Sequence, residues 1–355
     1  MIKILIADDS AVTRELLGYL FNSTSDFQVV GTAKNGKEAV EMTVEKSPDI
    51  VIMDINMPVM NGFEATRQIM ETRAVPIIVV SASYDQTEVE TSFRALEAGA
   101  LMILEKPQGI GHPGHAKAVD ELLRLTRLMS EVKVITRRKR KPESKIFDLK
   151  QESQPWNIIH NGFELVAIGT STGGPVVLQK ILSKLPAQFP VPIMIVQHIS
   201  KGFLEGMAEW LNQVSPLTVR IPQNMEILLP GYAYLAPDGF QIGVVKNDRL
   251  TVRLIQGQSK PAFCPSVAEM FRSVTNVLAP NVIGVLLTGM GNDGAHELKR
   301  MRDLGGITIA QNRESCVVFG MPKVAIELGA ARYILNPEEI AATLSALTQK
   351  NNKQE

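Results

Sequence analysis

The stretch Ile2-Lys3-Ile4-Leu5-Ile6-Ala7-Asp8-Asp9-Ser10 is an apolar run that ends abruptly in two carboxylates. Four more short apolar runs follow at helix-length intervals, namely Val29–Ala33, Ile50–Met53, Ile77–Val80 and Leu101–Leu104. Such runs, separated by amphipathic segments, are typical of buried parallel strands with helices on both faces of the sheet. A last helix is predicted at 114–130, where apolar residues recur at helical spacing. Residues 1–130 are therefore predicted to form an α/β domain with a doubly wound, parallel sheet of five strands.

Polar side chains suited to phosphate chemistry stand at the ends of four of these runs. Asp8 and Asp9 follow the first run, Asp54 follows the third, Ser81 follows the fourth and Lys106 comes just after the fifth. The carboxyl ends of parallel strands meet at one edge, so three carboxylates should converge there and need a cation such as Mg2+. The hydroxyl and ammonium groups could hold the oxygens of a phosphoryl group on Asp54. Taken singly, each aspartate could instead be a helix cap or a turn residue.

This half of the chain resembles the response-regulator receiver family. The matching motifs are Asp8-Asp9-Ser10, Met53-Asp54-Ile55-Asn56-Met57-Pro58, Asn61-Gly62, Ser81-Ala82 and Lys106-Pro107. The resemblance implies that a sensor histidine kinase phosphorylates Asp54, with Mg2+ held by Asp8, Asp9, Asp54 and the carbonyl of Asn56. Ile103 stands where many receivers carry an aromatic switch residue. That departure affects how phosphorylation is read out, and not the chemistry at Asp54.

The pattern changes twice more along the chain. Residues 131–160 include a charged, Pro-containing run at 136–145, which predicts a solvated linker, with a nucleic-acid or membrane patch as the alternative. Residues 161–348 then alternate between strand-like and helix-like segments, which predicts a second three-layer, Rossmann-like α/β domain. A hairpin-like insertion is expected within 216–262. Residues 349–355 form a polar tail.

A Gly-rich turn follows the first strand of this second half, in Glu164-Leu165-Val166-Ala167-Ile168-Gly169-Thr170-Ser171-Thr172-Gly173-Gly174-Pro175. The turn could bind phosphate through its N–H groups, or it could expose Ser171 as a nucleophile. A nucleophilic serine needs a base, and His198 directly follows the strand Ile193–Gln197, while His296 is a weaker candidate at a helix start. Asp293 lies in a glycine-rich loop after a third strand and could orient the histidine, although an Asx turn would explain it equally well in isolation. The order Ser, His, Asp differs from that of the α/β-hydrolase fold.

Residues 160–345 resemble the catalytic domain of the chemotaxis protein-glutamate methylesterases, the CheB family. The matching motifs are the turn 169–175, Val196-Gln197-His198, Leu235-Ala236-Pro237, the loop 287–294 and Val317-Val318-Phe319-Gly320-Met321-Pro322. The resemblance implies hydrolysis of glutamate methyl esters on chemoreceptors, with release of methanol, and deamidation of certain receptor glutamines. It assigns Ser171 as nucleophile, His198 as general base, Asp293 as its orienter and the N–H groups of Thr172 and Met290 as oxyanion donors. It implies no cofactor in this half. Thr170 and Ile199-Ser200 depart from the residues frequent in the family, at the rim of the site.

Composition restricts the remaining possibilities. The chain has 355 residues, zero formal net charge and two cysteines, which favours a two-domain cytoplasmic protein without a disulfide framework and argues against general nucleic-acid binding. No segment has the apolar length of a signal peptide or a membrane span, so no membrane insertion is expected, and we expect a monomer. A DNA-binding response regulator is a second hypothesis, although no helix-turn-helix is evident. A non-catalytic scaffold that sequesters receptors is a third.

Overall fold

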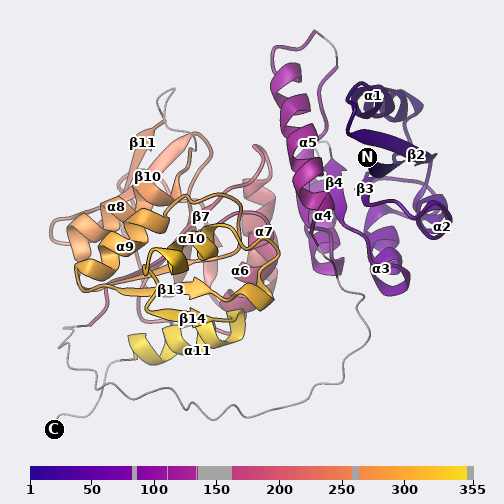
Figure 1. Cartoon of the computed structure of the whole chain (residues 1–355). Helices are drawn as coiled ribbons and strands as arrows, with labels where there is room; N and C mark the ends of the chain where they lie inside the picture. Colours follow the sequence, from indigo (N-terminus) through magenta and orange to yellow (C-terminus); the bar gives the residue numbers. More distant parts are fainter. Residues whose placement is uncertain (82–85, 110, 133, 135–161, 258–263, 350–355) are drawn as a thin grey trace.

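The computed structural model describes residues 1–81, 86–109, 111–132, 134, 162–257 and 264–349, together with the backbone but not the side chains of 86–90 within that range. It divides into an N-terminal and a C-terminal α/β half, each with its own parallel sheet (Figure 1). The predicted linker at 131–160 lies almost wholly outside the described residues, as does the predicted tail beyond Gln349. No helix among the described residues is long and apolar enough to cross a membrane.

The N-terminal half contains a five-stranded sheet in the order β2-β1-β3-β4-β5, in which every neighbouring pair is parallel. Its strands are β1 (Ile2–Ala7), β2 (Phe27–Ala33), β3 (Ile50–Met53), β4 (Ile77–Ser81) and β5 (Met102–Glu105). The strands are nearly continuous in apolar residues because both faces are covered. The predicted doubly wound sheet of five strands is therefore confirmed.

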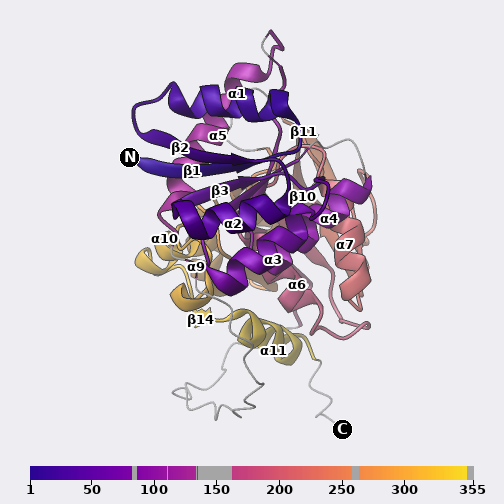
Figure 2. The ribbon, with the colours of Figure 1, turned by 90° about the vertical axis from the view of Figure 1, so that its right-hand side faces the viewer.

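Helices cover both faces of this sheet (Figure 2). Apolar side chains of α1 (Ala11–Asn22) and α5 (His115–Ser130) pack on one face. Those of α2 (Gly36–Lys46), α3 (Gly62–Thr72) and α4 (Gln86–Ala98) pack on the other. The helix predicted at 114–130 corresponds to α5. The order of the strands reverses direction between β1 and β3, which places the carboxyl ends of these two strands beside a crevice.

The C-terminal half contains a seven-stranded parallel sheet in the order β14-β13-β12-β6-β7-β9-β8. The strands are β6 (Leu165–Thr170), β7 (Ile193–Gln197), β8 (Thr218–Arg220), β9 (Tyr232–Leu235), β12 (Val282–Leu286), β13 (Ile307–Gln311) and β14 (Tyr333–Leu335). The direction of winding changes at β6, because β7 follows on one side of it and β12 lies on the other. A sheet of this kind contradicts the hypothesis of a helix-turn-helix DNA-binding domain.

Two helical layers enclose this second sheet. Apolar residues of α6 (Gly174–Leu182), α7 (Leu204–Val214) and α11 (Pro337–Thr348) pack on one face. Those of α8 (Val267–Leu278), α9 (Ala295–Asp303) and α10 (Met321–Glu327) pack on the other. The three-layer α/β prediction is confirmed. The expected hairpin within 216–262 is the antiparallel pair β10 (Phe240–Lys246) and β11 (Leu250–Gln256), although β8 and β9 from the same stretch join the main sheet.

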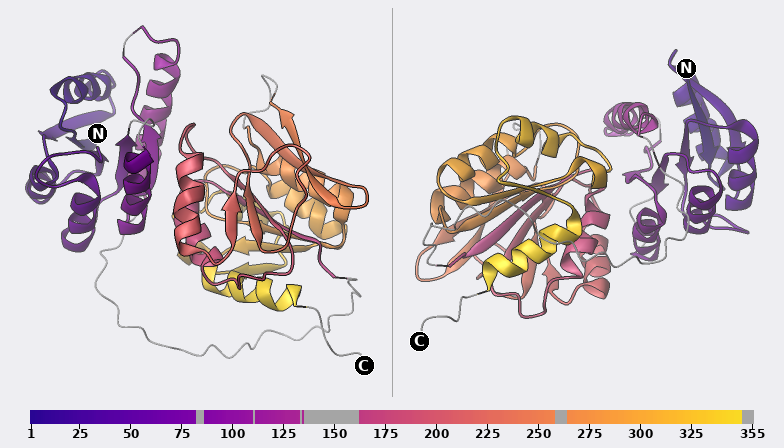
Figure 3. Two further views of the ribbon diagram at one scale, coloured as in Figure 1. Left: turned by 180° about the vertical axis from the view of Figure 1, so that it is seen from behind. Right: turned by 60° about the horizontal axis from the view of Figure 1, so that its bottom comes forward.

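The two halves meet where α4 packs against α6 and α7 (Figure 3). The ring of Phe93 in α4 stacks on Trp210 in α7, with centroids 5.2 Å apart and planes inclined by 17°. Both rings are almost completely buried. The receiver-like half therefore covers a specific apolar surface of the second half.

Candidate functional site

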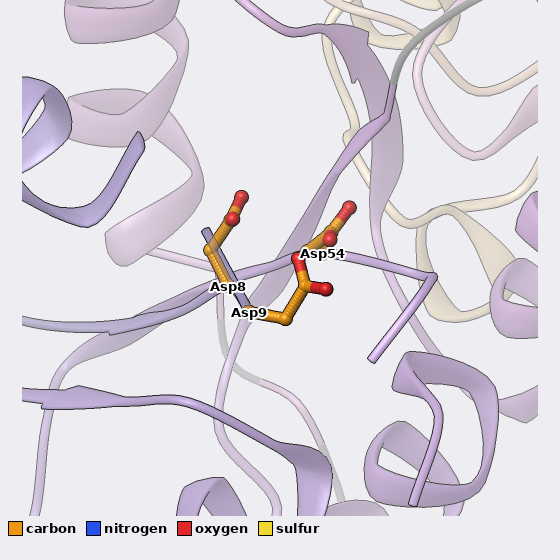
Figure 4. A group of neighbouring side chains, drawn as sticks. All are labelled: Asp8, Asp9 and Asp54. Atoms are coloured by element: carbon orange, nitrogen blue, oxygen red, sulfur yellow. The ribbon is translucent and has the colours of Figure 1, made fainter. Parts of the chain in front are cut away.

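The acidic cluster of the N-terminal half lies where the sequence predicts it, at the carboxyl edge of the sheet. Asp8 and Asp9 follow β1, Asp54 follows the neighbouring β3, and their side chains gather beside one another (Figure 4). One oxygen from each carboxylate lies within 4.8 Å of the others. Lys106 lies after β5, with its Nζ 3.0 Å from Oδ2 of Asp8 and 2.8 Å from Oδ1 of Asp54.

The electrostatics of this cluster favour a bound cation. Burial raises the pKa of Asp54 to about 7, although Lys106 works in the opposite direction. Burial alone would lower the pKa of Lys106, but Asp54 and Asp8 outweigh it and raise that pKa. Three carboxylates close together with one ammonium leave excess negative charge, and a hard divalent ion with oxygen ligands would offset it. The residues present therefore fit Mg2+.

Two further residues of the predicted phosphorylation site lie near this cluster in the sequence or the sheet. Asn56 is exposed two residues beyond Asp54, and Ser81 is buried at the end of β4. Their predicted roles stay predictions.

Ser171 lies in the turn between β6 and α6, at the point where the winding of the second sheet reverses. Its N–H donates to the carbonyl of Thr288, over 3.0 Å. A Cβ on Gly289 would lie 2.7 Å from the Cβ of Ser171, so the loop after β12 can approach this closely only with glycine there. Gly173 has a φ of +78°, which a left-handed turn before α6 requires. The glycines of both motifs therefore bring the two loops into contact.

His198 and Asp293 flank this turn from the two neighbouring strands. His198 follows β7, and its N–H donates to the carbonyl of Thr170 at the end of β6. Asp293 lies in the loop after β12, and its Oδ2 is 3.0 Å from Nε2 of His198. Both side chains are largely buried. The runner-up base, His296, is exposed on α9, and the described residues that line the cavity around Ser171 do not include it.

The first turn of α8 holds Asp293 in place. Its carboxylate accepts hydrogen bonds from the N–H groups of Val267 and Ala268, at 2.7 and 3.0 Å, and from the hydroxyl of Ser266 at 3.0 Å. Ser266 is also the N-cap of α8. Burial by itself would raise the pKa of Asp293, but the hydrogen bonds from His198 and these N–H groups outweigh it and lower that pKa. The carboxylate therefore stays charged opposite the histidine.

A second buried side chain joins the serine turn to the histidine turn. Nε2 of Gln197 donates to the carbonyl of Ser171 at 2.8 Å and to the carbonyl of His198 at 2.7 Å. The Gln197 side chain fits there because Gly174 has no Cβ, which would lie 2.1 Å from Oε1. The contribution of Gln197, like that of Ser266, escaped the prediction from sequence. The signals in the sequence were its position next to His198 and its place in the matching motif Val196-Gln197-His198.

One cavity includes Ser171 and His198 in its lining and is bounded by both halves of the protein. Ser171, Thr172, His198 and Met290 line it from the C-terminal half. The opposite wall comes from the N-terminal half and includes Leu96, Leu101, Ile103, Leu104, Arg124 and Leu125. The predicted oxyanion donors, Thr172 and Met290, thus line the same cavity as Ser171, and so does Ile103.

Comparison with known proteins agrees with both halves of this description. Residues 4–112 match the response regulator receiver domain, and residues 166–344 match the CheB methylesterase family. A relative from Syntrophus aciditrophicus, named protein-glutamate methylesterase/protein-glutamine glutaminase 1, is 48% identical over 347 residues that cover 98% of each chain. One of the same activity name, numbered 4, from Geobacter metallireducens is 47% identical over 99% of this chain and 100% of its own.

A solved structure extends the similarity to the arrangement of the second half. The CheB methylesterase catalytic domain of Thermotoga maritima is 37% identical, with a TM-score of 0.51, and the match covers 52% of this chain and 98% of that domain. Together with the two families matched along the chain, these relatives identify the protein as a member of the CheB methylesterase family with an N-terminal receiver domain.

Proposed function

We propose that this protein hydrolyses glutamate methyl esters and deamidates glutamines on chemoreceptors, and that phosphorylation of its receiver half increases this activity. The observation that carries the proposal is the convergence of Ser171, His198 and Asp293 at the switch point of the second sheet, beside a cavity that the receiver half lines on one side. Protein-glutamate methylesterase/glutaminase is also the activity named for relatives that align over nearly the whole chain.

The geometry supports acyl transfer through a covalent intermediate. Nε2 of His198 faces Asp293, so its proton is held there and the lone pair of Nδ1 is left to accept the proton of Ser171. The Ser171 oxygen attacks the ester or amide carbon, and the N–H groups of Thr172 and Met290 stabilise the oxyanion. The intermediate collapses as His198 returns the proton to methanol or ammonia. Water, deprotonated by His198, then attacks the carbon of the acyl-enzyme; the bond to the Ser171 oxygen breaks, that oxygen takes back the proton from His198, and glutamate is released.

The receiver half is proposed to control access to this site. Asp54 would accept a phosphoryl group from a sensor histidine kinase; the grouped carboxylates of Asp8, Asp9 and Asp54 would hold Mg2+, with the Asn56 carbonyl as a further ligand. The ion would neutralise charge on the transferring group. Lys106 and Ser81 would then contact the phosphoryl oxygens. The phosphoryl group on Asp54 would carry about −1.5 to −2 charge at pH 7 in place of the charge of the free carboxylate, and we expect this change to loosen the contact of α4 with α6 and α7.

We further propose the partners and the cellular location of this protein. The partners are methyl-accepting chemoreceptors and a histidine kinase, and the location is the cytoplasm, where such kinases phosphorylate receivers. Neither nucleic acid nor a permanent second subunit has a role in it.

The test is methanol release from methylated receptor, with and without a phosphodonor and Mg2+. We expect Ser171→Ala to abolish release, and Asp54→Asn or chelation of Mg2+ to abolish only the stimulation. A Ser171→Ala variant that keeps full activity in cells would favour the scaffold hypothesis. A fragment from about residue 150 onward that is no faster than the intact, unphosphorylated protein would contradict control by occlusion.

A further inference from the structure

The α6–α7 surface, formed by Gln179 and Trp210, makes polar as well as apolar contacts with α4. Glu97 lies one turn after Phe93 in α4, and its Oε1 accepts hydrogen bonds from Nε1 of Trp210, at 3.2 Å, and from Nε2 of Gln179. Two uncharged donors from two different helices therefore converge on a single side-chain oxygen. The stack of Phe93 on Trp210 fixes the apolar part of the same contact.

This surface is continuous with the active-site cavity. Leu96, next to Glu97 in α4, lines the cavity that contains Ser171. Gln179 is five residues beyond Gly174, the first residue of α6, which corresponds to about 7–8 Å along the helix axis. A single helical segment can therefore touch both the α6–α7 surface and the mouth of the cavity, as α4 does.

A protein substrate and α4 cannot use this region together. The receiver half supplies one wall of the cavity, so a helical segment of another protein that brings a glutamate side chain to Ser171 along α6 and α7 would take the place of α4. The departure of α4 would uncover the buried indole of Trp210 together with two donors that have lost their acceptor. Buried tryptophans with a donor at one end are typical anchors of protein interfaces.

We propose that the α6–α7 surface is the docking site of the protein substrate. In the closed state, which is the arrangement in this structure, α4 occupies that site in place of the substrate. The α6–α7 surface fits a helical segment with an apolar side chain at one position and an oxygen acceptor four positions later, the spacing of Phe93 and Glu97. Because both donors are uncharged, glutamate, glutamine and methyl-glutamate side chains next to the reacting one are all accepted. This inference rests on the proposed function and names how its substrate is held.

The experiment uses the full chain, membranes containing methyl-labelled chemoreceptor, and saturating small-molecule phosphodonor where stated. Trp210→Phe removes the indole N–H and keeps a ring, whereas Glu97→Ala removes its partner on the receiver side. Without phosphodonor, both variants should release methanol several-fold faster than the unchanged protein, because both weaken the closed state. With phosphodonor, Trp210→Phe should raise KM about tenfold with kcat nearly unchanged, while Glu97→Ala should leave KM unchanged.

Different outcomes would contradict the docking site and the proposed enzymatic function. If both variants are faster without phosphodonor and neither changes KM with it, the surface binds only the receiver half and the docking proposal is wrong. Gln179→Leu, at a half-buried helical position, replaces Trp210→Phe if the latter does not fold, with the same expected rise in KM. If the unchanged protein releases no methanol even with phosphodonor, the proposed function itself fails.

Discussion

At the scale of single residues, the carboxylate of Asp293 is surrounded by donors, with His198 on one side and the N–H groups in the first turn of α8 on the other. Replacement by asparagine keeps its size but puts an amide donor among groups that are themselves donors. The amide cannot hold the His198 proton on Nε2, so we expect Asp293→Asn to lower kcat by about 10^4-fold. Methanol release from methylated receptor measures this. A loss below tenfold would mean that His198 needs no orienting acid.

The pH dependence of stability provides a second test of the same carboxylate. The pKa of Asp293 is lower in the folded protein than its ordinary value of 3.8. Such a group adds stability above its unfolded pKa and loses that contribution as the pH falls through the folded pKa. We expect Asp293→Asn to be less stable than the unchanged protein by about 1–3 kcal/mol at pH 7, and the gap to shrink below about pH 4. Chemical unfolding at a series of pH values measures this difference in the free energy of unfolding. A difference that does not change with pH would mean that the loss comes from altered packing and not from the charge of Asp293.

At the scale of elements, the first turn of α8 holds the carboxylate of Asp293, the proposed partner of His198. Ser266 accepts from the N–H of Glu269 as the N-cap and donates to Asp293. We expect Ser266→Ala to reduce stability by about 1 kcal/mol and to lower kcat with little change in KM. Asn336→Ala is the matched control, because Asn336 caps α11 away from the cavity. It should cost similar stability and leave kcat unchanged; an equal fall in kcat would make the effect of Ser266 merely structural.

Sequence patterns predicted the elements whose signal is local. Continuous apolar runs identified the central strands of both sheets, and residues at their carboxyl ends came together because parallel strands share that edge. The edge strands β8 and β14 are three residues long and only partly buried, which leaves little apolar pattern to read. The helix α11 was not anticipated, despite its Asn336 capping box. Gln197 and Ser266 were missed because each contacts a group that only the fold brings near, the backbone carbonyl of Ser171 for Gln197 and the carboxylate of Asp293 for Ser266.

At the scale of the whole molecule, the receiver half forms one wall of the cavity beside Ser171. Leu101, Ile103 and Leu104 on β5 or beside it, and Arg124 and Leu125 on α5, form the wall opposite Ser171. The proposed phosphorylation site, Asp54, lies at the carboxyl edge of the same sheet, where Lys106 directly follows β5. Asp54 follows β3, so only β4 lies between it and β5, the strand that carries part of this wall. An aromatic switch residue is not required for that connection, because Ile103 itself lines the cavity.

The exposure of Ser171 can be measured without any receptor. A bulky, tagged fluorophosphonate reacts with activated serines, and in the closed protein the receiver wall should keep it from Ser171. We expect a phosphodonor with Mg2+ to speed labelling by about tenfold, the size of a modest shift between closed and open states. Asp54→Asn should label at the slow rate under both conditions, and Ser171→Ala gives the background. If methanol release rises with phosphodonor while labelling stays constant, phosphorylation acts on the catalytic residues and not on their accessibility.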